Sequence, residues 1–155
     1  MGRSYIDILG IPKGVIVTAV SPSGELDGGL NSQLAKKYPK IIKPYHEYCK
    51  DKDDSGIIKL GDVILVNVSP SLFIAFAFCI NQVQKSKGFE EIAFQTCLDT
   101  LESIVNDLSE QKQNLQLYFP YKMGSGILGG NWRTIEKLIE EKFPQISNIC
   151  IIPYK

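Results

Sequence analysis

Two glycine-rich stretches could do chemistry in this sequence: residues 21–29, SPSGELDGG, and residues 123–132, MGSGILGGNW. Glycines between a strand and a helix let backbone N–H groups approach a ligand closely, and the first turn of the helix adds further N–H donors. Phosphate is the usual ligand of such a loop. Neither stretch has the Lys-Ser/Thr ending of a P-loop or the glycine order of a dinucleotide-binding fingerprint. Each loop alone fits a tight turn equally well, but two together favour a diphosphate held between them.

The first loop also contains two acids, Glu25 and Asp27, which should repel an anion. Two unit charges about 4 Å apart repel by about 1 kcal/mol even in water. Three interpretations stay open for Asp27. It faces a ribose, where it accepts hydroxyl hydrogen bonds or acts as a general base for water; it caps the following helix; or it rejects ligands with a terminal phosphate. For Glu25 we expect a solvated position at the loop tip.

Hydrophobic patterning predicts the elements that would position both loops. We expect strands at residues 4–9, 14–20, 62–68, 72–80, 115–122 and 148–154, and helices that begin near residues 30, 44, 90 and 132. The third and fourth strands, joined by Ser-Pro-Ser, indicate a hairpin, and Asn131 is well placed to cap the last helix. The alternation of strands and helices predicts an α/β domain with a mixed central sheet flanked by helices. Ligands of such sheets bind beyond the carboxyl ends of strands, where both glycine loops fall.

Composition and charge limit the classes of function. The 155 residues suit one domain, and the 17 basic and 17 acidic residues balance, which argues against nucleic-acid binding. His46 and the scattered cysteines Cys49, Cys79, Cys97 and Cys150 lack the spacing of metal ligands, so we predict free thiols and no metal or cofactor. Nothing in the sequence predicts a signal peptide or a membrane span. We therefore expect a cytoplasmic monomer with no membrane partner.

Three segments together resemble a macro domain: VIVTAVSPSGELDGGLNSQLAKKYP, LGDV and FPYKMGSGILGGNWRTIEKLIEEKF. More narrowly, they are similar to the branch that includes yeast-type ADP-ribose-1″-phosphate phosphatases and small phage-borne macro proteins. The resemblance covers almost the whole chain, residues 1–155, and its most specific part is the closing Gly-x-Gly-x-x-Gly-x-x-Trp. It implies a single macro domain of three α/β/α layers, with ADP-ribose or a derivative bound across the ends of the strands.

By position, the resemblance also implies ligand contacts. Asp7 would accept from the adenine amino group, and Ile8 would flank the ring with backbone amides. The first loop would surround the distal ribose and one phosphate, and the second would hold the diphosphate. The ligand-binding candidates are Asp7, Ile8, Ser21, Gly24, Leu26, Asp27, Gly28, Gly29, Gly124, Ser125, Gly126, Ile127 and Leu128. The catalytic candidates are Asp27 and Ser21.

The sequence departs from the family pattern where catalysis would occur. Ser21 stands where the family usually has an asparagine that reaches the distal ribose, and Leu128 stands where other branches have an acid. Asn81 and Gln82 add polar groups at the mouth of the expected cleft, or belong to a loop that leaves the sheet. Two functions stay open. One is hydrolysis of an ADP-ribose derivative, with removal of the 1″-phosphate favoured; the other is a binding module that reads or sequesters such a nucleotide.

Overall fold

The computed structural model describes residues 2–23, 26, 29–50, 60–81, 87–109 and 115–152. Its strands are β1 (Gly2–Asp7), β2 (Gly14–Val20), β3 (Val63–Ser69), β4 (Leu72–Phe78), β5 (Leu117–Pro120) and β6 (Ser147–Ile151). Its α-helices are α1 (Gly29–Lys37), α2 (Ile42–Lys50), α3 (Glu91–Ser109) and α4 (Trp132–Lys142). Short 3-10 turns occupy Ile8–Gly10, Pro39–Ile41 and Gly126–Leu128.

The six strands form one sheet in the order β1-β6-β5-β2-β4-β3. All neighbouring pairs are parallel except β3 and β4, which form the predicted antiparallel hairpin. The mixed sheet expected from the sequence is therefore confirmed. Because β2 pairs with β5 on one side and with β4 on the other, the segments that follow these three strands leave the sheet at one edge.

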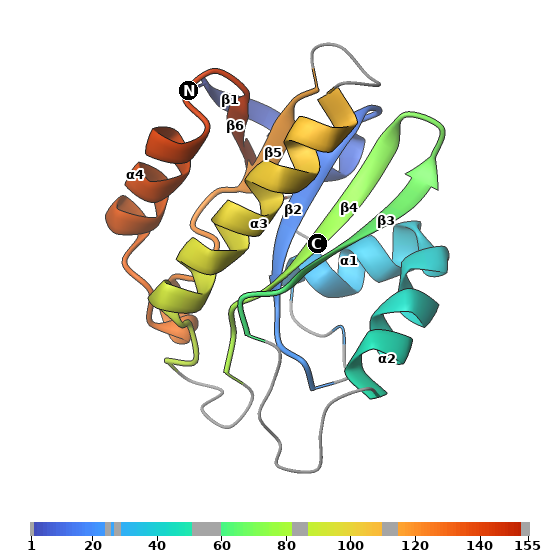
Figure 1. Ribbon diagram of the computed structural model, residues 1–155, viewed down its shortest axis with the longest axis horizontal. Helices are drawn as coiled ribbons and strands as arrows, with labels where there is room; N and C mark the ends of the chain where they lie inside the picture. Colours follow the sequence, from blue (N-terminus) through green and yellow to red (C-terminus); the bar gives the residue numbers. More distant parts are fainter. Residues whose placement is uncertain are drawn as a thin grey trace.

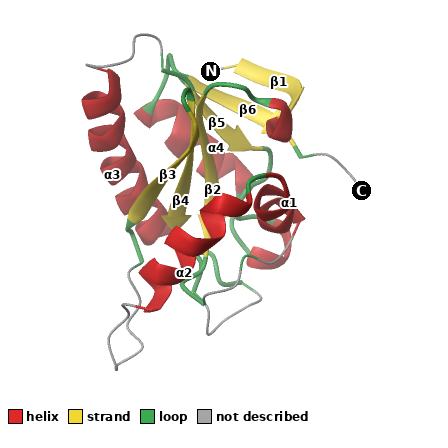
Figure 2. Ribbon diagram, turned by 90° about the vertical axis from the view of Figure 1, so that its right-hand side faces the viewer, coloured by secondary structure: helices red, strands yellow, loops and turns green. Residues whose placement is uncertain are grey.

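Helices cover both faces of the sheet, as Figures 1 and 2 show: α3 and α4 lie on one face, and α1 and α2 lie on the other. The inward side chains of β2 alternate between these layers. Val15 and Val17 belong to the cluster under α3 and α4, whereas Ile16 and Val20 belong to the cluster under α1 and α2. A central strand covered on both faces must be apolar throughout, which explains the GVIVTAV sequence. The predicted three-layer α/β/α fold is confirmed.

Several element boundaries differ from the predicted ones. The strand expected at residues 4–9 ends at Asp7, because the carboxylate of Asp7 accepts the Leu9 N–H at 2.8 Å and caps a 3-10 turn. The strand expected at 72–80 ends at Phe78, and the one expected at 115–122 covers only Leu117–Pro120. The chain stays buried past β1 and β4, at Ile8 and Cys79, whereas Tyr121 after β5 lies in an exposed turn. Apolar residues thus continue past the strand ends, so hydrophobicity overestimates strand length.

All four cysteines are buried, and none of them forms a disulfide. Burial raises the pKa of Cys79 well above its ordinary value, with a smaller contribution from Cys97. These thiols therefore behave as small apolar side chains of the core. Among the helices that the structure describes, none has the length and hydrophobicity needed to cross a membrane.

Candidate functional site

A cleft with a volume of about 480 Å³ lies at the carboxyl edge of the sheet. This volume is within the range of roughly 300–1,000 Å³ that is typical of small-molecule sites. Its lining residues follow four neighbouring strands: Ser21 after β2, Asn81 after β4, Lys122 after β5 and Ile152 after β6. Parts of both glycine loops line it as well. The described residues of both loops thus line a single open space.

The glycines of the second loop serve two different purposes. A Cβ atom on Gly124 would lie 2.6 Å from the Phe89 ring, and one on Gly130 would lie 2.4 Å from the carbonyl oxygen of Gly124. A Cβ on Gly129 would lie 2.8 Å from Lys87. These three glycines therefore allow the loop to pack against the segment between β4 and α3. Gly126, by contrast, has φ 66° and open space where its side chain would be.

The second loop leaves two backbone donors at the cleft. Backbone carbonyl oxygens accept five of its N–H groups: those of Met123, Ser125, Leu128, Gly129 and Gly130. The N–H groups of Gly124 and Ile127, which both line the cleft, have no partner among the residues that the structure describes. Free amides that converge on a concave surface form an anion-binding arrangement. The predicted cap is also present, because Oδ1 of Asn131 accepts the Thr134 N–H at 3.2 Å.

Lys122 is the only charged side chain among the cleft-lining residues that the structure describes. Its backbone has φ 64°, a left-handed conformation that a lysine rarely adopts. Its carbonyl oxygen accepts the Ser125 N–H at 3.1 Å and the Ser125 hydroxyl at 2.6 Å. Its ammonium lies 5.5 Å from the centre of the Tyr121 ring. Lys122 thus adds a positive charge to the residues that line the cleft.

Polar side chains also meet at the end of β2. The Ser21 hydroxyl oxygen accepts the Ser23 N–H at 3.2 Å, and the Tyr45 hydroxyl donates to the Ser21 carbonyl oxygen. Deeper in the cleft, Asn31 of α1 accepts from the Thr18 hydroxyl at 2.5 Å and donates to the Ala19 carbonyl oxygen at 3.0 Å. Neither Thr18 nor Asn31 is among the residues predicted from the sequence. A strand threonine and a helix asparagine are unremarkable until the fold brings them together.

The residues predicted to contact adenine lie beside the cleft and do not line it. Asp7 is half-buried and pairs in register with Ile151, the residue before cleft-lining Ile152. Its carboxylate caps the turn that follows β1. Burial, followed by the charge of Asp7, raises the pKa of Cys150 to about 11. Ile8 is fully buried in the cluster under α1 and α2, so it can offer only its backbone.

The other candidates fall into three groups. Gly29, Gly124, Ser125, Ile127 and Leu128 line the cleft. Leu26 is half-buried against the core under α1 and α2, and Gly126 stands at the open side of the second loop. Gly24, Glu25, Asp27, Gly28 and Gln82 lie outside the described residues. The described part of the chain contains no group of three His, Cys, Asp or Glu residues that could hold a metal ion.

The fold defined by this sheet and its two helix layers is that of macrodomains. The macrodomain of Mycobacterium tuberculosis DarG matches with a TM-score of 0.78 and 18% identity, covering 99% of this chain and 97% of that chain. The structure titled Thermosipho africanus DarTG in complex with ADP-ribose matches with a TM-score of 0.66 and 15% identity, covering 91% of this chain and 38% of that chain. The macrodomain fold predicted from the resemblance is therefore confirmed.

A curated protein is also similar in sequence. An ADP-ribose 1″-phosphate phosphatase from Lodderomyces elongisporus is 23% identical over 142 residues, which cover 89% of this chain and 86% of that protein. No family model matches the sequence.

Proposed function

We propose that this protein binds ADP-ribose or a close derivative in the cleft and hydrolyses the derivative ADP-ribose-1″-phosphate with water to ADP-ribose and phosphate. The observation that carries the proposal is that Lys122 lines the same cleft as Gly124 and Ile127, whose N–H groups have no partner among the described residues. Backbone amides and a cation together suit a pyrophosphate. The phosphatase among the relatives and the ADP-ribose complex among the structural neighbours support the choice of ligand.

The order of the strands suggests how such a ligand would lie. The second loop follows β5, so it would hold the pyrophosphate near the middle of the cleft. The adenosine half would extend over β6 towards β1, where Asp7 is available to the adenine amino group. The distal ribose would then extend the other way, over the ends of β2 and β4, where Ser21 and Asn81 lie.

Hydrolysis needs a group that activates water, and Asp27 is the best candidate. Among the described cleft-lining residues, no carboxylate or imidazole is present, and Leu128 cannot act as an acid or a base. Ser21 uses a lone pair to accept the Ser23 N–H. The carboxylate of Asp27 is therefore the general base that we propose, with the second loop stabilising negative charge on the ligand.

A second function, binding without turnover, is favoured by the same absence of an acid–base pair among the described cleft-lining residues. Titration calorimetry with ADP-ribose tests the binding that both functions share. Phosphate release from ADP-ribose-1″-phosphate then separates them, because only the phosphatase turns over. Binding of ADP-ribose without phosphate release would establish the binding module, and failure to bind any adenine diphosphate compound would exclude both.

A further inference from the structure

Asn31 of α1 is held by two hydrogen bonds to the neighbouring strand. Its Nδ2 donates to the Ala19 carbonyl oxygen at 3.0 Å, and its Oδ1 accepts from the Thr18 hydroxyl at 2.5 Å. A backbone carbonyl can only accept, so the nitrogen of the side-chain amide must face Ala19 and the oxygen must face Thr18. The orientation of the carboxamide is thereby fixed before any ligand binds.

These two bonds use half of what the carboxamide offers. A side-chain amide has two N–H donors and an oxygen with two lone pairs, and one donor and one lone pair are occupied. Asn31 is half-buried and lines the cleft, so the remaining donor and lone pair are available to a ligand there. A donor beside an acceptor suits two adjacent sugar hydroxyls, since each hydroxyl can donate and accept. A phosphate, which only accepts, would use the donor alone.

The place of Asn31 along the cleft indicates which sugar it would meet. It lies against β2, and β6 lies on the other side of β5 and the second loop. With the pyrophosphate at the second loop and adenosine over β6, the group that extends over β2 is the distal ribose. At this end the Ser21 hydroxyl oxygen accepts the Ser23 N–H and Asn81 donates to Glu90 at 3.4 Å, while Asn31 contributes an amide that two hydrogen bonds orient.

We propose that Asn31 hydrogen-bonds the adjacent hydroxyls of the distal ribose and thereby gives the cleft its preference for ADP-ribose over ADP. This inference rests on the proposed function. Thr18, a residue that is 3% exposed, is a positioning residue, because its hydroxyl orients the amide oxygen. ADP has no distal ribose, so it leaves the remaining N–H and lone pair of Asn31 without a ligand partner. The cleft therefore binds ADP more weakly than ADP-ribose.

Titration calorimetry with ADP-ribose and with ADP, on the wild-type protein and on Asn31→Ala, tests the proposal. We expect the variant to bind ADP-ribose about tenfold more weakly, as for the loss of two hydrogen bonds, and to bind ADP as before. An unchanged ratio of the two affinities would overturn the inference and leave the proposed function intact. If the wild-type protein binds neither compound, the proposed function itself fails.

Thr18→Val provides a second variant, because it keeps Asn31 and the shape of the strand but removes the hydroxyl that orients the amide. We expect it to reduce the preference for ADP-ribose over ADP by about threefold. A purely structural role would lower the affinity for both compounds equally and would refute the proposal. Asn106→Ala, at an exposed position of α3, is the matched control and should leave both affinities unchanged. Should Asn31→Ala not fold, the ratio measured with Thr18→Val decides.

Discussion

Lys122 is the residue whose charge should matter most for an anionic ligand. Lys122→Ala removes the ammonium but keeps a Cβ atom, so the unusual φ of 64° is retained and the backbone strain is unchanged. We expect the affinity for ADP-ribose to fall by about tenfold, equivalent to about 1.4 kcal/mol. Titration calorimetry at low and high salt should also show that the affinity of the variant for ADP-ribose depends less on salt. Salt screens the attraction between the Lys122 ammonium and the ligand, and the variant lacks this attraction.

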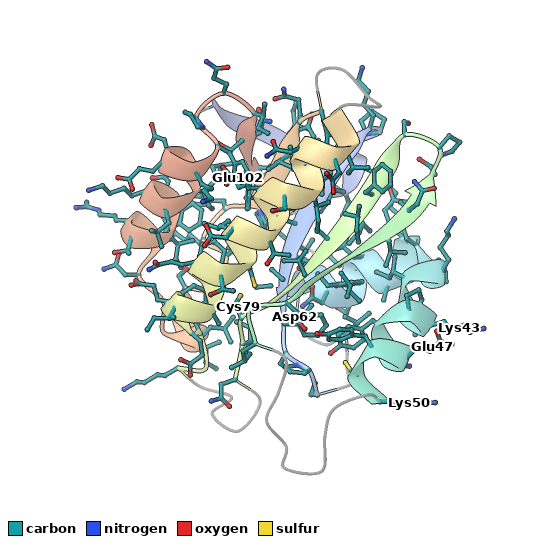
Figure 3. All side chains as sticks on the ribbon, in the orientation of Figure 1. Lys43, Glu47, Lys50, Asp62, Cys79 and Glu102 are labelled. Carbon is teal, nitrogen blue, oxygen red and sulfur yellow. The ribbon has the colours of Figure 1, made fainter. Side chains whose placement is uncertain are left out.

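Lys43→Ala is the control for this charge change. Lys43 forms an exposed ion pair with Glu47, with 4.0 Å between the nitrogen and the oxygen, and Figure 3 shows both residues at the outer side of α2. Like Lys122→Ala, the substitution Lys43→Ala removes one positive charge, but Lys43 does not line the cleft. Equal losses of affinity in the two variants would mean that net charge, and not the position of Lys122, attracts the ligand.

Asp27 can be assigned to one of its three interpretations by comparing two substitutions. If it is a general base, Asp27→Asn should abolish phosphate release from ADP-ribose-1″-phosphate but keep the affinity for ADP-ribose. If it caps α1, Asp27→Ala should lower the free energy of unfolding by about 1 kcal/mol, whereas Asp27→Asn should not, since asparagine caps equally well. If it repels phosphate, both variants should bind ADP-ribose-1″-phosphate more tightly. Phosphate release, denaturant unfolding and calorimetry distinguish these outcomes.

At the scale of an element, the second loop should respond differently to alanine at two of its glycines. A Cβ on Gly130 would press on the backbone of Gly124, so we expect Gly130→Ala to cost about 1–3 kcal/mol and to displace the amide that faces the ligand. Gly126 has open space, and alanine there carries only the cost of its positive φ, about 1 kcal/mol. Denaturant unfolding and calorimetry would show the difference. Equal losses of stability and affinity in Gly130→Ala and Gly126→Ala would contradict the close contact between Gly130 and Gly124.

The start of α4 provides a milder test of the same loop. Asn131 accepts the Thr134 N–H, and Asn131→Ala would leave that donor without its protein acceptor. We expect the free energy of unfolding to fall by about 1 kcal/mol, measured by denaturant unfolding. Asn131→Ser keeps a capping oxygen and should remain close to the wild type. A loss in the serine variant as large as that in alanine would show that the cap is not the cause.

The elements could largely be predicted from the sequence, but the contacts that complete the site could not. Periodicity predicts the strands, the helices and the hairpin, and the glycine loops indicate where the cleft should lie. The interaction of Asn31 with Thr18 requires α1 to pack on β2, and the clash positions of Gly124 and Gly130 require Phe89 to lie behind the loop. Such contacts depend on which elements pack together in the fold, and hydrophobic periodicity does not contain that information.

For the whole molecule, the order of the strands matters more than the strands themselves. The two glycine loops are about a hundred residues apart in sequence, and their described residues line one cleft because β2 and β5 are neighbours, with Val15 opposite Leu117. Alternating patterns predict a layered sheet but not its order. The sequence therefore predicts a shared cleft only from the general behaviour of open sheets, and the pairing of β2 with β5 supplies its structural cause.

Buried thiols couple the stability of the whole molecule to alkaline pH. Burial, and then the charge of Asp62, raises the pKa of Cys97 from 9.0 to about 12. Between these values the unfolded chain loses this proton while the folded protein keeps it, so the folded state binds more protons. The free energy of unfolding must then decrease as the pH rises above 9.0, by at most about 1.4 kcal/mol per pH unit for this thiol. Cys150, with its pKa of about 11, acts in the same direction.

Denaturant unfolding at a series of alkaline pH values measures this slope. Cys97→Ala removes the titrating group, and it also leaves a small cavity that lowers stability at every pH. The variant should therefore be less stable near neutral pH but should show a shallower decline above pH 9.0, because only the wild-type chain gains this proton-linked cost. Parallel curves for the two proteins would mean that Cys97 ionises as readily in the folded state as in the unfolded chain. That result would contradict the burial of the Cys97 side chain between α3 and the sheet.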